Sequence, residues 1–212
     1  MTPRIVRIED AGPDRKARRL VFEDGLDPRV TSAAVVKELG LEADSTVPAD
    51  SLEVALAEAE HRLAKDRALG LLGYRERSAA ELARKLRDSG YAASTVSPIV
   101  GRFIELGLVD DERFAGMWVR SRVSAGHGAR GIARELAEKG VAPQVISAAL
   151  ERDCPADTQV ASARESLRGR RPADRKERDR LVRRLVARGF DLSTALQAVS
   201  EVESDFEEPS ET

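Results

Sequence analysis

Four arginines surround a short glycine-containing junction in the second half of the chain. Arg120 and Arg122 precede Gly126-His127-Gly128, and Arg130 and Arg134 follow it. Backbone amides at the start of a helix and guanidinium groups both bind anions, so this arrangement predicts a site for a phosphate or carboxylate group. We expect the centre of a binding surface here.

The alternative for each of these arginines is a purely structural role, because surface arginines on helices are usually solvated or paired with a nearby carboxylate. Arg130 could pair with Glu135 or Glu138. Other parts of the helical region supply further candidates of the same kind: Arg75, Arg77, Arg84 and Arg87, and later Arg170, Arg171, Arg183, Arg184 and Arg188. The run from Arg168 to Arg180 also contains acidic residues, which favours a solvated helix start over a phosphate clamp.

No combination of residues favours catalysis. His127 has no serine or cysteine beside it, and Cys154, next to Pro155, is interpreted as a linker thiol. Asp110 and Asp111 follow Gly107 at a predicted helix start, where aspartate caps free amides, so we expect no paired-carboxylate or metal site. The glycines around His127 lack the preceding strand of a phosphate loop. We therefore predict a protein that is not an enzyme and that uses no cofactor.

Two aromatic residues, Phe114 and Trp118, are spaced four residues apart on one predicted helix. Stacking against a nucleic-acid base is one possible role. The spacing is that of a buried helix face, so we assign both side chains to the core.

The composition indicates a mostly helical protein. Of the 212 residues, 42% are hydrophobic, 34% are charged and only 4% are aromatic. One cysteine and two histidines exclude a disulfide framework and a zinc module built on several thiolates. The sequence has no apolar run long enough to cross a bilayer and begins with charged residues, so we expect a cytoplasmic protein, monomeric by default and without membrane contact.

Charge is distributed unevenly along the chain. Residues 1–57 carry −3, residues 58–200 carry +7 and residues 201–212 carry −6, which gives the total of −2. The basic middle is where a polyanionic partner should bind. The acidic segment 201–212 is predicted to be disordered and, as a hypothesis, to compete with such a partner.

The first fifty residues read as a small α+β segment. Alternating residues over 4–9 and 17–22, separated by a break at Gly12-Pro13-Asp14, predict a β-hairpin. A short helix near 28–39 should cover one face of it, because an isolated hairpin is marginally stable. We interpret the segment as a cap on a helical array, with a docking surface as the alternative.

Three helical repeats are predicted after residue 50. Residues 81–91, 131–141 and 180–190 align without a gap, and each ends at a glycine followed by a hydrophobic residue. The glycine spacings of 50 and 49 residues are typical of stacked helical units, because glycine ends a helix cheaply in the left-handed conformation. Capping residues are consistent with these boundaries. They are Ser78 with Glu81, Pro143 and Asp191.

Each repeat should also have a helix before the glycine-ended one and another after it. The earlier helices are expected near 63–72, 111–123 and 159–168. We therefore predict a mostly α fold of tandem three-helix repeats in a curved array. The predicted boundaries are 1–50, 51–107, 108–155, 156–200 and 201–212.

Four motifs together resemble the RecX family over about residues 60–200. They are Arg67-Ala68-Leu69-Gly70-Leu71-Leu72, Arg77-Ser78-Ala79-Ala80-Glu81-Leu82, Gly107-Leu108-Val109-Asp110-Asp111-Glu112-Arg113-Phe114-Ala115 and Arg134-Glu135-Leu136-Ala137-Glu138-Lys139-Gly140-Val141. The resemblance implies a regulator of the recombinase RecA. Such a protein would bind RecA filaments on single-stranded DNA and restrain strand exchange, ATP hydrolysis and coprotease activity, within homologous recombination, DNA repair and the SOS response.

The residues themselves leave a second possibility open. The charge of +7 alone would suit a general nucleic-acid-binding helical module, on single- or double-stranded DNA, that acts without RecA. The candidate contacts with a filament or nucleic acid are the same in both cases: Arg75, Arg77, Arg84, Arg87, Arg120, Arg122, His127, Arg130, Arg134, Arg183 and Arg184.

Overall fold

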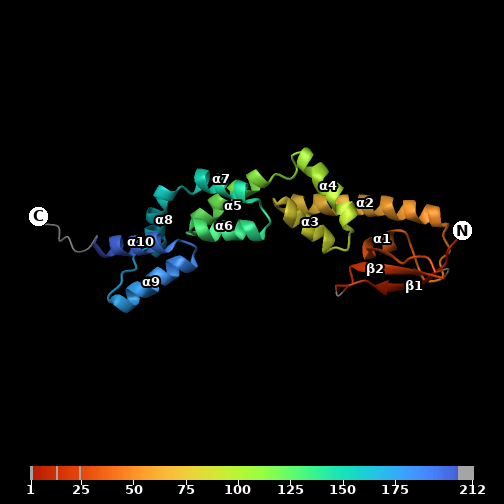
Figure 1. Cartoon of the computed structure of the whole chain (residues 1–212), viewed down its shortest axis with the longest axis horizontal. Helices are drawn as coiled ribbons and strands as arrows, with labels where there is room; N and C mark the ends of the chain where they lie inside the picture. The colour runs from red at the N-terminus through yellow and green to blue at the C-terminus, as the bar shows by residue number, and fades with distance from the viewer. Residues whose placement is uncertain (1, 13, 24, 205–212) are drawn as a thin grey trace, which may run out of the picture. The chain divides into compact units, whose positions relative to one another are not determined.

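The computed structural model describes residues 2–12, 14–23 and 25–204, which form two compact units, Met1–Asp110 and Asp111–Thr212 (Figure 1). The prediction of a disordered tail over 201–212 is wrong for residues 201–204, which are helical, and residues 205–212 lie outside the described residues. In chain order the elements are β1 (Ile5–Asp10), β2 (Ala17–Phe22), β3 (Arg29–Ser32), α1 (Ala33–Glu38), α2 (Ala49–Tyr74), α3 (Ala79–Arg87), α4 (Ala93–Glu105), α5 (Asp111–Ser124), α6 (Ala129–Glu138), α7 (Pro143–Asp153), the 3-10 turn η1 (Ala156–Thr158), α8 (Gln159–Leu167), α9 (Arg175–Ala187) and α10 (Leu192–Ser204).

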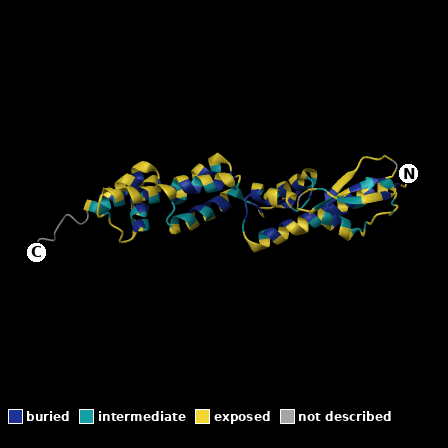
Figure 2. Ribbon diagram, turned by 90° about the horizontal axis from the view of Figure 1, so that it is seen from below, coloured by how far each residue is buried: buried dark blue, intermediate teal, exposed yellow. Residues whose placement is uncertain are grey.

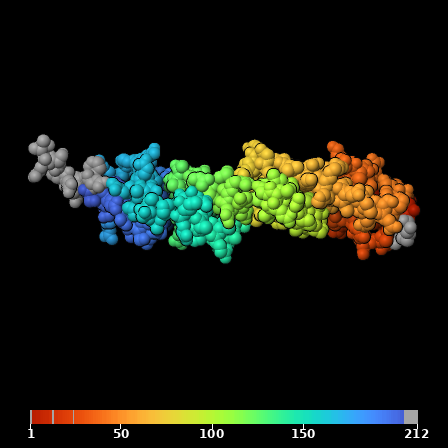
Figure 3. Space-filling model, turned by 90° about the horizontal axis from the view of Figure 1, so that it is seen from above, coloured from red at the N-terminus to blue at the C-terminus, as the bar shows by residue number. Residues whose placement is uncertain are grey.

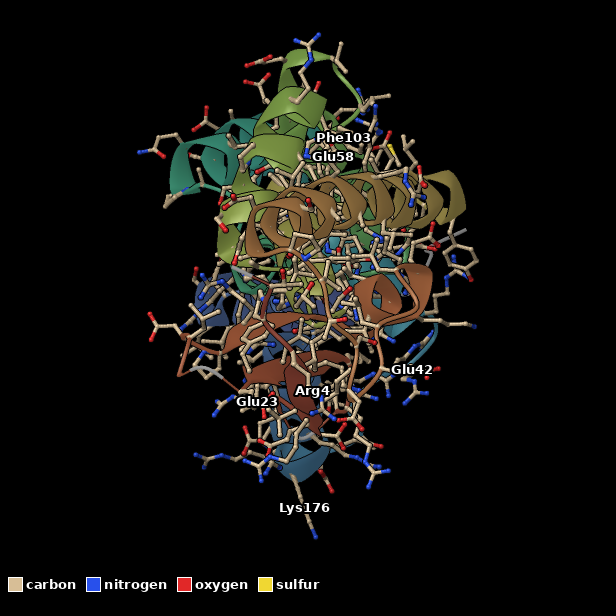
Figure 4. The ribbon with its side chains drawn as sticks, turned by 90° about the vertical axis from the view of Figure 1, so that its right-hand side faces the viewer. Arg4, Glu23, Glu42, Glu58, Phe103 and Lys176 are labelled. Carbon is tan, nitrogen blue, oxygen red and sulfur yellow. The ribbon has the colours of Figure 1, made fainter. Side chains whose placement is uncertain are left out.

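The predicted hairpin is confirmed. Strands β1 and β2 pair in antiparallel register, with Ile8 opposite Leu20, and Ile5 and Leu20 are fully buried. Beside this sheet, Arg4 lies next to Glu23, with the nearest nitrogen and oxygen 3.9 Å apart (Figure 4). The alternating pattern therefore placed the buried face of the sheet correctly.

The prediction of a helix near 28–39 is partly wrong. Residues 29–32 form β3, which pairs antiparallel with β2, and the helix α1 begins only at Ala33. Val30 and Thr31 have strand-favouring β-branched side chains, and β2 offers them an unpaired edge. Ser32 ends the strand and caps α1, because its hydroxyl oxygen accepts a hydrogen bond from the amide of Val35.

Helix α2 serves two hydrophobic cores. Its first half contributes Leu52, Leu56 and Ala59 to the core beneath the sheet. Its second half contributes Ala64 and Ala68 to the core shared with α3 and α4. The N-terminal segment and the first repeat are therefore joined through a continuous helix.

Two further contacts fix the N-terminal segment against the first repeat. The carboxylate of Glu60 is buried and accepts hydrogen bonds from the amide of Ala92, at 2.7 Å, and from the Thr31 hydroxyl, at 3.4 Å. Gly90 has a φ of +91°, and a Cβ there would overlap the backbone of Lys16. These contacts hold the N-terminal segment against the first repeat, and its role as a cap or as a docking surface stays a prediction.

The first repeat consists of the second half of α2 with α3 and α4. Ser78 caps α3 as predicted, since its hydroxyl accepts from the amide of Glu81 at 3.1 Å. Leu82, Leu86 and Phe103 fill its core. Alternating buried and exposed stripes along the helices are visible in Figure 2.

The second repeat repeats this arrangement with α5, α6 and α7. Phe114, Ile132 and Leu136 form its core, and Gly140 ends α6 with a φ of +76°. Pro143 occupies the first turn of α7 as predicted, where its missing amide hydrogen costs nothing.

The third repeat consists of α8, α9 and α10. Leu181, Leu185 and Phe190 lie in its core, and Gly189 ends α9 with a φ of +90°. Asp191 accepts a hydrogen bond from the amide of Thr194 at 2.8 Å, which confirms it as the cap of α10. In the space-filling view the second and third repeats, coloured green to blue, abut directly (Figure 3).

Candidate binding surface

The glycine junction between α5 and α6 does not leave its amides available to an anion. The amides of Gly128 and Gly131 donate to the carbonyl oxygens of Arg188 and Gly189, at 3.0 and 3.1 Å. The amide of Ala129 donates to the side-chain oxygen of Gln159, also at 3.0 Å. The predicted convergence of backbone amides on an anion is therefore wrong, because the third repeat already satisfies them.

His127 is half-buried in this junction, and its backbone amide donates to the Arg122 carbonyl at 3.0 Å. Nearby, Cys154 is buried and its sulfur accepts a hydrogen bond from the side-chain Nε2 of Gln159 at 2.9 Å. Burial raises the pKa of the Cys154 thiol, which keeps it protonated and unreactive. The Cys154 thiol is thus held in a structural contact with Gln159.

The arginines of the second repeat are mostly paired. Arg122 donates to Glu135 at 2.6 Å, and Arg120 approaches Asp153 at 3.2 Å. Both pairs link different helices. Asp153 also binds Arg152, and these two arginines hold the pKa of the Asp153 carboxyl below its usual value, the Arg152 hydrogen bond being the larger cause.

Two exposed arginines of α6 differ from these. Arg134 makes only a loose contact with Glu138, at 3.9 Å. Arg130 makes no ion pair with any residue that the structure describes, so it does not form the pairs with Glu135 or Glu138 that the spacing allowed. These side chains remain available to a partner.

Phe114 is in the core as predicted, and Trp118, which is partly buried, packs against the same core. Two cations lie over the indole ring, with the Arg122 guanidinium carbon 4.6 Å and Lys139 Nζ 4.1 Å from the ring centroid. Its Nε1 donates to Glu135 at 2.8 Å, so Trp118 joins a charged cluster at the surface of the second repeat.

In the first repeat, Arg77 is not part of an exposed binding surface. Its side chain is only 8% exposed and donates to Glu81, at 2.6 Å, and to the Leu71 carbonyl. Arg75 also binds Glu81, whose side chain is 4% exposed. The prediction of Arg77 as a contact residue is corrected here: its guanidinium compensates a buried carboxylate. Arg84 and Arg87, by contrast, are exposed on α3.

The third repeat holds arginines of a different kind. Arg183 donates to the carbonyl of Asp179 at 3.1 Å and is exposed. Arg184 is close to Arg170, Arg180 and Arg188, and repulsion from Arg170 is the largest cause lowering its pKa. Arg180 is not among the candidate residues predicted from the sequence. The spacing of 180, 184 and 188 on one helix was the available signal.

The described residues contain no group of three or more His, Cys, Asp or Glu side chains that could hold a metal ion. None of the helices in the described part of the chain combines the length and the apolar character that a membrane span requires.

Two family models match the helical region of the chain. The first three-helix domain of RecX matches residues 64–103, and the second three-helix domain of RecX matches residues 110–150. The protein named Regulatory protein RecX in Mycobacterium sp. (strain KMS) is 42% identical over 141 residues, which cover 62% of this chain and 77% of that protein. The chain belongs to the RecX family. The RecX protein of Halorhodospira halophila (strain DSM 244 / SL1) is 40% identical over 146 residues, covering 68% of this chain and 90% of that protein.

Solved RecX structures share the fold. A crystal structure described as regulatory protein RecX superposes with a TM-score of 0.58 at 21% identity, covering 91% of this chain and 96% of that one. RecX from Lactobacillus salivarius gives the same TM-score at 22% identity, covering 68% and 97%. The arginines of residues 170–188 lie outside both matched RecX domains.

Proposed function

We propose that this chain is a regulatory protein that binds RecA filaments on single-stranded DNA and inhibits their recombinase, ATPase and coprotease activities. Membership of the RecX family, whose relatives carry the name Regulatory protein RecX, is the observation that carries the proposal. The proposal includes a non-enzymatic role in the cytoplasm, within recombination and the SOS response.

The exposed cations supply a surface suited to a RecA filament on DNA. Such a filament presents both protein carboxylates and DNA phosphates. The candidates with accessible side chains are Arg75, Arg84, Arg87, Arg120, Arg130, Arg134 and Arg183, with Arg122, His127 and Arg184 partly accessible. Paired arginines can exchange one carboxylate for another, so a pair within the chain does not prevent contact with the filament.

The decisive experiment measures affinity for single-stranded DNA alone and for the same DNA coated with RecA and a non-hydrolysable ATP analogue. We expect much tighter binding to the coated DNA at every salt concentration. Equal affinity for the two would contradict the proposal. Trp118 is the only tryptophan and lies among charged side chains, so its emission provides an intrinsic signal for binding near α5 and α6.

A second candidate function is direct nucleic-acid binding without RecA, favoured by the net charge of +7 over residues 58–200. It predicts that the affinity for bare DNA falls steeply and linearly on a log–log plot against salt, and that RecA adds nothing. The same titration separates the two functions.

A further inference from the structure

The positive charge of the helical region is concentrated in its third repeat. Residues 58–158 contain 16 Lys and Arg against 15 Asp and Glu, whereas residues 159–204, up to the end of α10, contain 11 against 7. The first two repeats are therefore nearly neutral, and the third repeat carries +4. An electrostatic partner will be attracted mainly to this repeat.

Four arginines of this repeat gather in one place. Arg180, Arg184 and Arg188 follow one another at intervals of four residues, which puts them on one face of α9. Arg170, in the segment that connects α8 to α9, is close enough to be the strongest electrostatic influence on Arg184. Lys176, in the first turn of α9, projects into solvent (Figure 4).

Within the described part of the chain, the four arginines have no counterion. Over residues 2–12, 14–23 and 25–204, their side chains make no hydrogen bond or ion pair, and the Nε of Arg184 is buried without a partner. The arginines of the second repeat differ, because Arg120 and Arg122 each form an ion pair with a carboxylate of the chain. A buried donor without an acceptor is costly, so a bound anion would stabilise the cluster.

The cluster lies at the seam between the second and third repeats. A Cβ added to Gly126 would lie 3.2 Å from Arg188 Nη1 and 3.3 Å from the Cβ of Ser166. The junction that the sequence singled out as an anion site thus borders Arg188, the residue that follows α9, although the amides of the junction are occupied.

We propose that Arg170, Arg180, Arg184 and Arg188 form a binding site for the backbone phosphates of a nucleic-acid strand. The planar guanidinium fork binds phosphate oxygens in bidentate fashion. Four residues of helix advance about 6 Å, which is comparable to the separation of successive phosphates along a strand. This regular spacing favours a polyphosphate backbone over the irregular carboxylates of a protein surface.

This phosphate site deepens the proposed function. It rests on that function only for the choice of single-stranded DNA as the polyanion. The test uses the full-length chain and a fluorescein-labelled oligothymidylate, with no recombinase present, across a salt series. The test variant is Arg180→Gln/Arg188→Gln, which spares the partly buried Arg184. The matched control is Arg62→Gln/Arg102→Gln, which removes the same charge from exposed arginines paired with Glu38 and Glu105.

We expect the test variant to bind about tenfold more weakly than the wild type, and the slope of log affinity against log salt to fall by about 1.4, or 0.7 for each lost contact. The control should stay within about twofold of the wild type, because exposed charges outside the cluster are screened by salt. Arg180→Lys/Arg188→Lys should bind with intermediate affinity, since lysine keeps the positive charge but cannot bind phosphate in bidentate fashion.

Equal losses in the test and control variants, or an unchanged salt slope, would overturn the proposal. Retained oligothymidylate binding combined with lost binding to RecA-coated DNA would also overturn it, because the cluster would then contact protein. If the wild type binds bare and coated DNA equally, the proposed function fails, and the comparison of slopes on bare DNA still decides the phosphate site. Circular dichroism of the variants verifies that each remains folded.

Discussion

Gly131 and Gly189 lie in direct backbone contact between the second and third repeats. The amide of Gly131 donates to the carbonyl of Gly189 at 3.1 Å, and a Cβ added to Gly131 would lie 2.9 Å from the Cα of Gly189. Gly189 therefore has two roles, since it ends α9 in the left-handed conformation and also allows α6 to approach. Only a residue without a side chain satisfies both.

Gly189→Ala should consequently lower the free energy of unfolding by about 3 kcal/mol, the sum of backbone strain at positive φ and steric overlap with Gly131. The matched control is Gly107→Ala. Gly107 also has a positive φ, of +68°, but a Cβ there meets nothing within 4 Å, so the cost should be about 1 kcal/mol. Urea unfolding of both variants measures the difference in the free energy of unfolding. Equal losses of stability would contradict the steric role of the contact between Gly131 and Gly189.

The second prediction concerns the buried carboxylate of Glu81, whose replacement should destabilise the fold. Glu81→Gln leaves Arg77, whose side chain is 8% exposed, without its ionic partner. Removing one member of a buried pair typically costs about 3 kcal/mol, because the remaining charge stays desolvated. Thermal unfolding should show a clearly lower melting temperature than for Glu105→Gln, which breaks the exposed pair with Arg102 at a cost below about 0.5 kcal/mol. Similar melting temperatures for the two variants would show that the Glu81 cluster is not structural.

Acid should destabilise the second unit through two aspartates. The hydrogen bond and charge of Arg152, followed by those of Arg120, lower the pKa of Asp153, and hydrogen bonds from Ser193 and Thr194 lower that of Asp191. A carboxyl whose pKa is lower in the folded state stabilises the fold above its unfolded pKa of 3.8 and loses that contribution as pH falls through the folded value.

The measurement is the free energy of unfolding between neutral pH and pH values below about 4. Asp153→Asn should be less stable than the wild type at neutral pH and should lose less stability on acidification, so that the two curves converge. Asp191→Asn should behave in the same way, but its loss of stability at neutral pH should be smaller, because asparagine remains a good helix cap. Parallel curves would refute the assignment.

Much of the fold could be predicted because its signals are local. Ser78, Pro143 and Asp191 cap or start helices through contacts within four residues, and the glycines that follow α6 and α9 end them through their own φ angles. Strand β3 was missed because its four residues are fixed by pairing with β2, which no local pattern reports.

The binding surface was harder to predict for the same reason. Arg120 pairs with Asp153, 33 residues away, and the amides of the glycine junction are occupied by residues from another repeat. The sequence identified a basic region, but which cations stay uncompensated depends on contacts between helices. Arg180 and Arg188 stand out only after the pairs of the second repeat are known.

The last prediction concerns the acidic residues after α10. Glu201 and Glu203 pair with Arg164 and Arg178, so a truncation that removes only competing charge should end at Ser204. The removed segment carries four carboxylates. If these compete with a polyanion for the basic third repeat, the truncated chain should bind single-stranded oligothymidylate about fivefold more tightly at 0.05 M salt, roughly the low-salt limit at which charges interact most strongly. The gain should vanish at higher salt, because screening weakens the internal competitor. A full-length variant with the four carboxylates replaced by amides should match the truncation, and unchanged affinity in both would exclude the competition.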